Sequence, residues 1–161
     1  MLKKEVIEYI RQFRDEDKES FPGDAVAHMI ELLYNRMVKL NNQYFAKYGT
    51  TFEQFDVLAV IIYLTGDKGL SQLELSRRLC VSQGNITRIV DRMMKQGLVT
   101  KAPWEDDRRY NIVSPTKKGM DLFNEVNPGF KKLVSGYCKN IKEYQKLKEF
   151  LMKWLYDLRE G

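Results

Sequence analysis

Residues 82–95 carry polar side chains that share one face of a predicted helix. The members of this set are Gln83, Asn85, Thr87, Arg88, Asp91, Arg92 and Lys95. These side-chain types suit a DNA groove, because Arg donates two hydrogen bonds to guanine, Gln and Asn bond adenine, and a Thr methyl group meets the thymine methyl. Any solvated helix face also carries such residues, so the face taken alone favours an ordinary exposed surface.

Two further observations favour a polyanion as the partner. The polar face holds three basic side chains and one acid, Asp91, and a polar loop further on places Arg108 and Arg109 at the tip of a predicted hairpin. An arginine at such a tip can enter a narrow, electronegative minor groove. The sequence therefore offers one element for each groove of a duplex.

The charge of the chain is concentrated in its middle third. The 161 residues have a net charge of +5, but residues 1–67 carry −3, residues 68–120 carry +6 and residues 121–161 carry +2. A local basic block in a folded chain indicates binding to a polyanion, although added surface lysines would give a similar excess.

The middle third also has a helix–turn–helix pattern. Ser71-Gln-Leu-Glu74 fits a capping box that opens a short helix ending near Leu79. Cys80-Val81 forms the turn, and Ser82 caps the helix that bears the polar face. A helix presented in this way can enter a DNA major groove.

Two short strands are predicted after these helices. They cover Leu98–Lys101 and Tyr110–Ser114, and the segment between them, Ala102–Arg109, is too polar and too interrupted by proline to belong to a strand. Two short helices followed by a hairpin make a winged helix-turn-helix.

Predicted helices flank this lobe on both sides. A short helix over 2–14 precedes a long one that Asp24 caps and Gly49 ends, and a Thr51–Gln54 capping box opens a buried helix over 55–64. Thr116 caps the next helix, which Pro128 should kink or break, and a last helix spans 144–158. The predicted fold is mainly α (α+β), as a single domain over 1–161. It has a winged helix-turn-helix lobe with a two-stranded wing over about 52–115, and flanking helices over about 2–48 and 116–159.

The motifs of this region resemble those of the MarR family (multiple antibiotic resistance regulators) in sequence and order. The matching segments are Leu70–Leu79, Ser82–Asp91, Gln96–Val99, Asp107–Arg109 and Thr116–Gly119. Pro115 departs from the family pattern, in which Leu is usual at this point. The resemblance implies a homodimer, joined through the flanking helices, that regulates transcription by binding a pseudo-palindromic double-stranded DNA operator, as a ligand-responsive repressor. Because the sequence shows neither a transmembrane stretch nor a secretory signal, we expect the chain to stay in the cytoplasm.

The helix face and the resemblance together give a predicted set of DNA-contacting residues. The set is Ser82, Gln83, Asn85, Thr87, Arg88 and Arg92 on the second helix, Ser71 and Gln72 on the first, and Arg108 and Arg109 in the wing. By the resemblance, Asp107 is the wing acid and would orient an arginine through a charge-assisted hydrogen bond.

The family also binds small aromatic or phenolic effectors in a crevice between the dimer helices and the lobe. Candidate lining residues in this chain are His28, Tyr34, Tyr48 and Phe55, with Tyr44 and Trp104 as further aromatic candidates. At helical spacing each of them could equally be an ordinary core residue.

Other classes of function lack supporting residues. Two cysteines and one histidine cannot form a Cys/His metal site, and we expect Cys80 to be a small core residue of the turn. No cofactor is expected, no catalytic constellation indicates an enzyme, and no apolar stretch is long enough for a transmembrane helix or resembles a secretory signal. The alternatives that remain open are a winged-helix module that binds protein instead of DNA, and a small helical enzyme.

Overall fold

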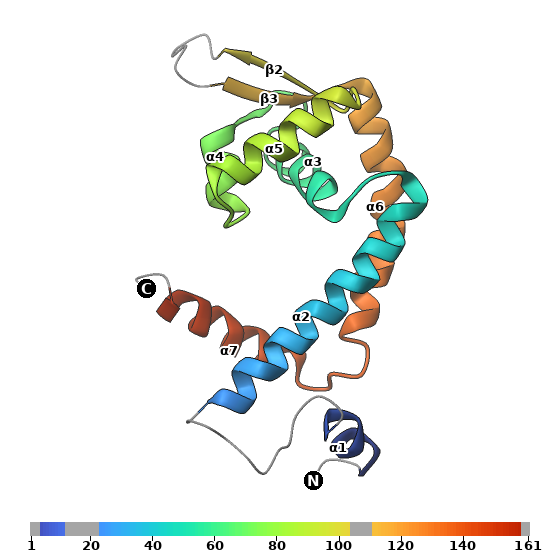
Figure 1. The fold of residues 1–161 in the computed structure, drawn as a ribbon, viewed down its shortest axis with the longest axis vertical. Coiled ribbons are helices and arrows are strands. Elements are labelled where there is room, and N and C mark those ends of the chain that lie inside the picture. Colours follow the sequence, from blue (N-terminus) through green and yellow to red (C-terminus); the bar gives the residue numbers. More distant parts are fainter. Residues whose placement is uncertain (1–3, 12–22, 104–110, 159–161) are drawn as a thin grey trace. The chain divides into compact units, whose positions relative to one another are not determined.

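The structure of this protein is a computed structural model that describes residues 4–11, 23–103 and 111–158. The chain divides into two compact units, residues 1–47 and residues 48–161, which we describe separately (Figure 1). Within the described ranges, no helix has both the length and the apolar character needed to cross a membrane.

The N-terminal unit contains two helices, and a short 3-10 turn spans its boundary in sequence with the second unit. Helix α1 spans Lys4–Arg11, helix α2 spans Asp24–Phe45, and the 3-10 turn η1 covers Ala46–Tyr48. The residue at the N-cap of α2 is Gly23, at φ 84°, and not Asp24 as predicted. Asp24 is instead the first helical residue, where a carboxylate still suits the positive end of the helix dipole.

Helix α2 is long but hides little of its surface. Of its 22 residues only Asn41 and Phe45 are buried. Its exposed large apolar residues are Val26, Ile30, Leu33, Tyr34 and Met37. A helix with an apolar stripe of this length normally covers that stripe with another element.

The second unit begins with the predicted buried helix. Helix α3 spans Phe52–Thr65, and its start is the predicted capping box, because Thr51 Oγ1 accepts from the Gln54 N–H while Gln54 Oε1 accepts from the Thr51 N–H. Val57, Leu58 and Ile61 are fully buried. The prediction of a central helix is thus confirmed, although its last turn emerges at Tyr63, which is 59% exposed.

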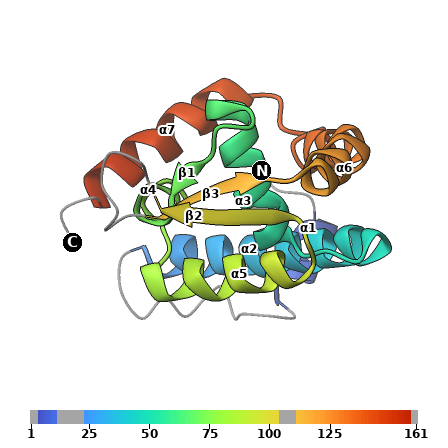
Figure 2. The ribbon, with the colours of Figure 1, turned by 90° about the horizontal axis from the view of Figure 1, so that it is seen from above.

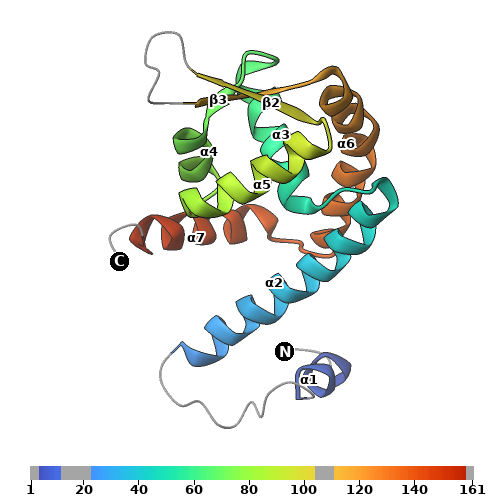
Figure 3. The ribbon, with the colours of Figure 1, turned by 45° about the horizontal axis from the view of Figure 1, so that its top comes forward.

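The helix–turn–helix and the sheet follow α3 directly. Helix α4 spans Gln72–Arg78 and helix α5 spans Gln83–Lys95. Strands β1 (Leu70–Ser71), β2 (Val99–Pro103) and β3 (Asn111–Pro115) form an antiparallel sheet in the order β1-β3-β2, seen from above in Figure 2. Figure 3 shows α4 and α5 beneath this sheet, with α3 behind α5.

The sheet corrects the prediction of a two-stranded wing in two respects. A third strand, β1, pairs Leu70 with Val113 and Ser71 with Ile112, and its two residues were too few to give a strand signal. Strand β2 also continues through Ala102 to Pro103, which the polar and proline-rich sequence had excluded. Proline is tolerated there because β2 is an edge strand, where one missing N–H need not interrupt a ladder.

Helix α6 (Lys117–Tyr137) starts at the predicted cap and runs through Pro128 without a break. Its third residue, Gly119, has no space for a side chain, because a Cβ there would collide with the Leu98 carbonyl. Of the two predicted effects of Pro128, a break is wrong, whereas a kink stays a prediction. Pro128 and Asn124 are both exposed, so water can bond the Asn124 carbonyl that Pro128 leaves without an N–H donor.

The last helix, α7, spans Tyr144–Asp157, and none of its residues is buried. Its exposed large apolar side chains are Tyr144, Leu147, Phe150, Leu151, Met152, Leu155 and Tyr156. As with α2, the apolar stripe is far larger than an isolated chain usually leaves in water.

Candidate nucleic-acid interface

Helix α5 separates its apolar and polar residues cleanly. One side of the helix is buried and carries Ile86, Ile89, Val90 and Met93. On the opposite side Gln83, Thr87, Arg88 and Arg92 are exposed, and Asn85 is half-buried. Because the buried stripe fixes the rotation of the helix, the predicted polar face is presented to solvent as one surface.

The start of α5 is held by its own cap. Ser82 Oγ accepts a hydrogen bond from the Asn85 N–H at 3.3 Å, as the sequence predicted. Gly84 follows in the first turn, and a Cβ built there would meet nothing within 4 Å. The backbone of this turn is therefore open to an approaching molecule.

Thr87 and Gln72 lie together across the two helices of the motif. Gln72 Nε2 donates to Thr87 Oγ1 at 3.3 Å, and Thr87 Oγ1 itself donates to the Gln83 carbonyl at 3.0 Å. With its hydroxyl engaged in this way, Thr87 has mainly its methyl group to offer a ligand. This contact also joins the start of α4 to the polar face of α5.

Arg88 is positioned by its neighbour on the same face. Arg88 Nη2 lies 3.5 Å from Asn85 Oδ1, which is a long hydrogen bond at the surface of the helix. A guanidinium has five N–H donors, so most of those of Arg88 remain for a partner.

The acid of this face is paired with a wing residue. Asp91 Oδ1 lies 4.0 Å from Lys101 Nζ on β2. Lys101 therefore offsets the negative charge that Asp91 would otherwise place among Arg88, Arg92 and Lys95. No local pattern predicts this pair, because the two residues come from different elements ten positions apart.

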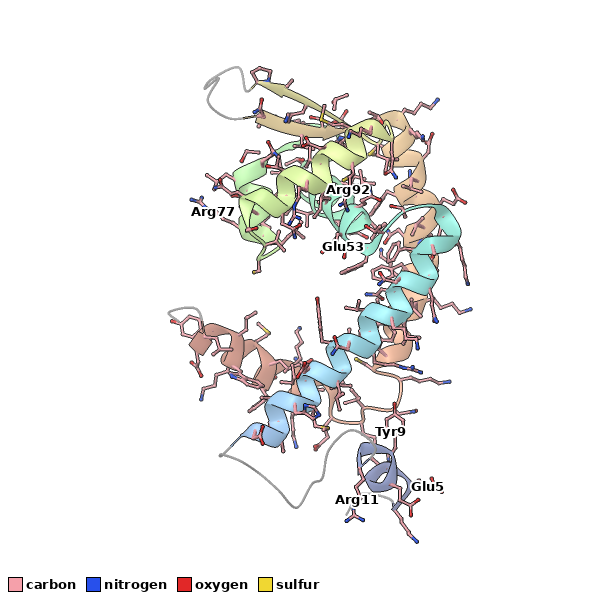
Figure 4. All side chains as sticks on the ribbon, viewed as in Figure 1. Glu5, Tyr9, Arg11, Glu53, Arg77 and Arg92 are labelled. Atoms are coloured by element: carbon pink, nitrogen blue, oxygen red, sulfur yellow. The ribbon has the colours of Figure 1, made fainter. Side chains whose placement is uncertain are left out.

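Ser71 has two structural roles at the start of α4. It is the last residue of β1, and its Oγ accepts from the Glu74 N–H at 3.1 Å. The predicted capping box is only half formed, because the Glu74 carboxylate instead pairs with Arg78 Nε at 2.7 Å. Figure 4 shows Arg77 extending from α4 on the side away from α5, which adds an exposed cation that the predicted set omitted.

The wing tip lies outside the described residues. Asp107, Arg108 and Arg109 fall in the segment 104–110, between the end of β2 at Pro103 and the start of β3 at Asn111. The two strands hold the ends of this segment next to each other, since Pro103 pairs with Asn111. The roles assigned to these three residues stay predictions.

A separate hollow of about 720 Å³ opens between α3 and α6. Its lining residues are Phe55, Asp56, Ala59, Val60, Tyr63, Leu64, Arg78, Asn127, Phe130, Lys131, Val134 and Ser135. The walls are mainly aromatic and aliphatic, with a few polar groups that could orient a bound molecule, as is usual for small-molecule sites.

The four predicted effector residues have different locations. Phe55 lines the α3–α6 hollow, whereas Tyr48 lines a smaller one of about 340 Å³ near Gln96 and Lys118. His28 and Tyr34 lie on α2 of the N-terminal unit, and His28 Nδ1 is 3.7 Å from Glu31. Tyr63, Asn127 and Lys131 are hollow residues that the sequence did not single out.

The polar groups of the hollow interact with one another. The Tyr63 hydroxyl and Asn127 are within hydrogen-bond distance, and Lys131 Nζ lies 5.6 Å from the centre of the Tyr63 ring. Burial, and secondarily the nearby charge of Glu53, raise the pKa of Asp56 above its ordinary value. The hollow thus combines a carboxyl group that resists ionisation with cationic and aromatic groups.

Cys80 does not occupy the apolar position expected for it. It is exposed in the turn between α4 and α5, with φ 51°, and Cys138 is exposed as well. The Cys80 thiol donates to the Arg77 carbonyl at 3.8 Å on the surface of the turn and does not enter the core.

The fold and the exposed face of α5 define a class of protein. Two helices joined by a tight turn, followed by a β-hairpin, form a winged helix-turn-helix, which presents its second helix to a DNA major groove. The predicted fold class is confirmed, with the sheet enlarged by β1.

Comparisons with known proteins identify the family. A MarR family profile matches residues 48–109. The transcriptional activatory protein BadR of Rhodopseudomonas palustris is 37% identical over 75 residues, which are 47% of this chain and only 43% of BadR. The HTH-type transcriptional repressor YetL of Bacillus subtilis is 27% identical over 131 residues, covering 80% of this chain and 77% of YetL.

Solved structures agree with the sequence relatives. A mutant MarR from E. coli, crystallised in complex with operator DNA, aligns with a TM-score of 0.75 at 25% identity and covers 84% of this chain and 99% of that one. These comparisons support a MarR family winged-helix regulator, because the family profile covers the lobe at residues 48–109 and the fold matches a solved MarR structure. Because the relatives are regulators, the predicted class is confirmed and a catalytic role is not supported.

Proposed function

We propose that this protein is a homodimeric transcription regulator that binds a pseudo-palindromic operator and responds to a small molecule, most simply as a repressor. The observation that carries the proposal is the exposed face of α5, where Arg88 and Arg92 stand over a buried apolar stripe and Lys101 neutralises Asp91. Such a regulator acts where the chromosome lies, so we place it in the cytoplasm.

In this proposal the residues of the α5 face have separate roles. Arg88 donates to a guanine edge, Gln83 or Asn85 bonds an adenine, and the Thr87 methyl contacts a thymine methyl. The hydrogen bonds that Thr87 makes with Gln72 and Gln83 support this role, because they engage its hydroxyl group. Ser82 and Arg92 complete the contacts of this helix.

Contacts outside α5 position the lobe on the phosphate backbone. Ser71 and Gln72 sit at the start of α4, where a helix N-terminus favours a phosphate. Arg108 and Arg109 contact the minor groove, and Asp107 orients one of the arginines. Contacts of this kind fix the register of a protein on DNA without reading its sequence.

The dimer forms through the flanking helices, over about 2–48 and 116–159. The apolar stripes of α2 and α7 support this assignment, because α2 buries only two of its residues in the single chain and α7 buries none. A second copy would cover these stripes. Dimer symmetry then places two α5 helices in successive major grooves, roughly 34 Å apart.

The effector is a small aromatic or phenolic molecule, and the α3–α6 hollow is the site we assign to it. The hollow is large enough for such a ligand and offers Phe55, Tyr63 and Phe130 as aromatic walls. A ligand that changes the separation of the two α5 helices must bind free and DNA-bound protein with different affinities, because coupling between two sites is reciprocal.

The experiment that tests the proposal is selection of bound duplexes from a random pool, followed by a salt titration of the recovered sequence. A recovered palindrome with half-sites about one helical turn apart supports the dimeric docking. The logarithm of the affinity should fall with the logarithm of salt concentration at a slope of about −0.9 for each phosphate contacted. An affinity for duplex DNA that is absent or insensitive to salt would instead favour a protein-binding module.

A further inference from the structure

The C-terminal end of α5 is joined to the first turn of α3 by a bridge between two glutamine side chains. Gln54 Nε2 donates to Gln96 Oε1 at 2.7 Å. Gln54 is only 4% exposed and Gln96 is the C-cap of α5. In Figure 4, Glu53 marks this turn of α3 and Arg92 marks the last turn of α5.

The orientation of both amide groups follows from their partners. The Thr51 N–H can only donate, so the atom of Gln54 that it meets at 3.2 Å must be the oxygen. The same oxygen accepts from Thr50 Oγ1 at 3.1 Å, which leaves Nε2 to face Gln96. Because Nε2 also only donates, Gln96 must present its own oxygen. The bridge therefore has a single hydrogen-bonding arrangement.

The same end of α5 is held by other bonds. The N–H groups of Gly97 and Leu98 close on the carbonyls of Met94 and Met93, both at 2.9 Å. Lys118 Nζ donates to the Gln96 carbonyl at 2.8 Å, where a cation suits the negative end of the helix. These bonds end the helix, but the Gln54–Gln96 bridge is the side-chain bond that ties it to α3.

A small change of tilt at this end of α5 displaces the other end of the helix. The 13 residues of α5 span roughly 20 Å, so a tilt of about 5° about the C-cap moves the first turn by about 2 Å. A displacement of that size removes hydrogen bonds to base edges, which need donor–acceptor distances near 3 Å.

We propose that Gln54, acting through Gln96, is a positioning residue that sets the tilt of α5 and thereby the discrimination among DNA sequences. This inference rests on the proposed DNA binding. Flexible side chains that contact phosphates can adjust to a small tilt of the helix. Side chains that form paired hydrogen bonds with base edges cannot. Loss of the bridge should therefore lower specific binding while non-specific binding persists.

The test uses Gln96→Met, which removes the acceptor from an exposed position while keeping the size of the side chain. We expect affinity for the selected operator to fall about tenfold, with affinity for a scrambled duplex and the salt slope unchanged. Gln96→Glu keeps an acceptor for Gln54 and should restore the ratio of specific to non-specific affinity.

The outcomes separate the two proposals. If the unmodified protein prefers no sequence, the proposed function fails. If it does prefer one, and Gln96→Met retains the same ratio of specific to non-specific affinity, the positioning role is overturned. Equal loss in Gln96→Met and Gln96→Glu also overturns it, since the acceptor is then not what matters. The buried variant Gln54→Met is secondary, because it can fail to fold.

Discussion

Asp91 of the recognition helix α5 and Lys101 of the wing strand β2 face each other with 4.0 Å between Oδ1 and Nζ. The pair is partly exposed, with Asp91 at 51% and Lys101 at 28%, so its contribution to the stability of the fold is about 1 kcal/mol or less. Its importance lies in the charge of the surface, where it neutralises the acid of the α5 face.

The variant Lys101→Met should expose DNA to the uncompensated charge of Asp91. We expect weaker binding to operator and scrambled duplexes alike, by about threefold to tenfold at low salt, with an unchanged melting temperature. Fluorescence anisotropy at two salt concentrations measures this. In the double variant with Asp91→Asn the loss should largely disappear, and its persistence would show that Lys101 contacts phosphate directly.

Arg88 should contribute to sequence preference more than to general affinity. Replacing it with alanine should cost about 1–3 kcal/mol of operator binding and relax the preference at one base pair, if it bonds guanine through two donors. Arg88→Lys keeps the charge but lacks the paired donors, so it should lose the preference while retaining most non-specific affinity. Repeating the duplex selection with both variants gives the answer, and an unaltered base preference rules out this role.

Replacing Gly84 with alanine should change the stability of the fold and the affinity for DNA in opposite directions. A Cβ there meets nothing within 4 Å, and alanine in a helix is more stable than glycine by about 0.5–1 kcal/mol. Gly84→Ala should therefore raise the melting temperature yet weaken operator binding, because the added methyl lies where DNA approaches the first turn of α5.

The matched control is Gly136→Ala near the end of α6, which is equally open within the chain. It should affect stability in the same direction without changing the affinity of the lobe for DNA. If Gly84→Ala binds operator as well as the unmodified protein does, the backbone of that turn does not approach DNA closely.

The raised pKa of Asp56 makes the contribution of this residue to the stability of the fold depend on pH. Its folded-state pKa is raised, chiefly by burial, above the unfolded value near 3.8. The charged form is thus the costly one in the fold, so the contribution of Asp56 becomes less favourable as pH rises from below 3.8 through the folded pKa.

The variant Asp56→Asn should accordingly gain stability over the unmodified protein near neutral pH, and this advantage should vanish below pH 3.8. Urea unfolding of both proteins across that range measures the difference. A constant difference at every pH would contradict the assigned cause.

Sequence patterns located the main elements because their signals are local. The Thr51–Gln54 capping box, the Ser82 cap and the buried stripe of α5 depend on residues within a few positions of one another. The polar face of α5 was predictable for the same reason, since a buried stripe fixes the opposite side of a helix.

The remaining features depend on contacts between distant residues. Strand β1 has two residues and exists only because β3 pairs with it, and the exposure of Asn124 and Pro128 decides whether a proline breaks α6. Gln54 and Gln96 are 42 positions apart, so their bridge could not be read from local spacing. Identifying the lining of the hollow likewise required α3 and α6 to be placed together.

Ser71 belongs at once to β1 and to the cap of α4, so the sheet and the helix–turn–helix share a residue. Just before it, Gly69 at φ 85° lies so close to β3 that a Cβ would collide with Ser114. For protein engineering, α5 therefore cannot be exchanged alone between relatives, because the sheet and the cap of α4 that surround it would still be those of the original protein. A transplanted segment should run from residue 50 to residue 115, so that it also carries Gln54, the partner of Gln96.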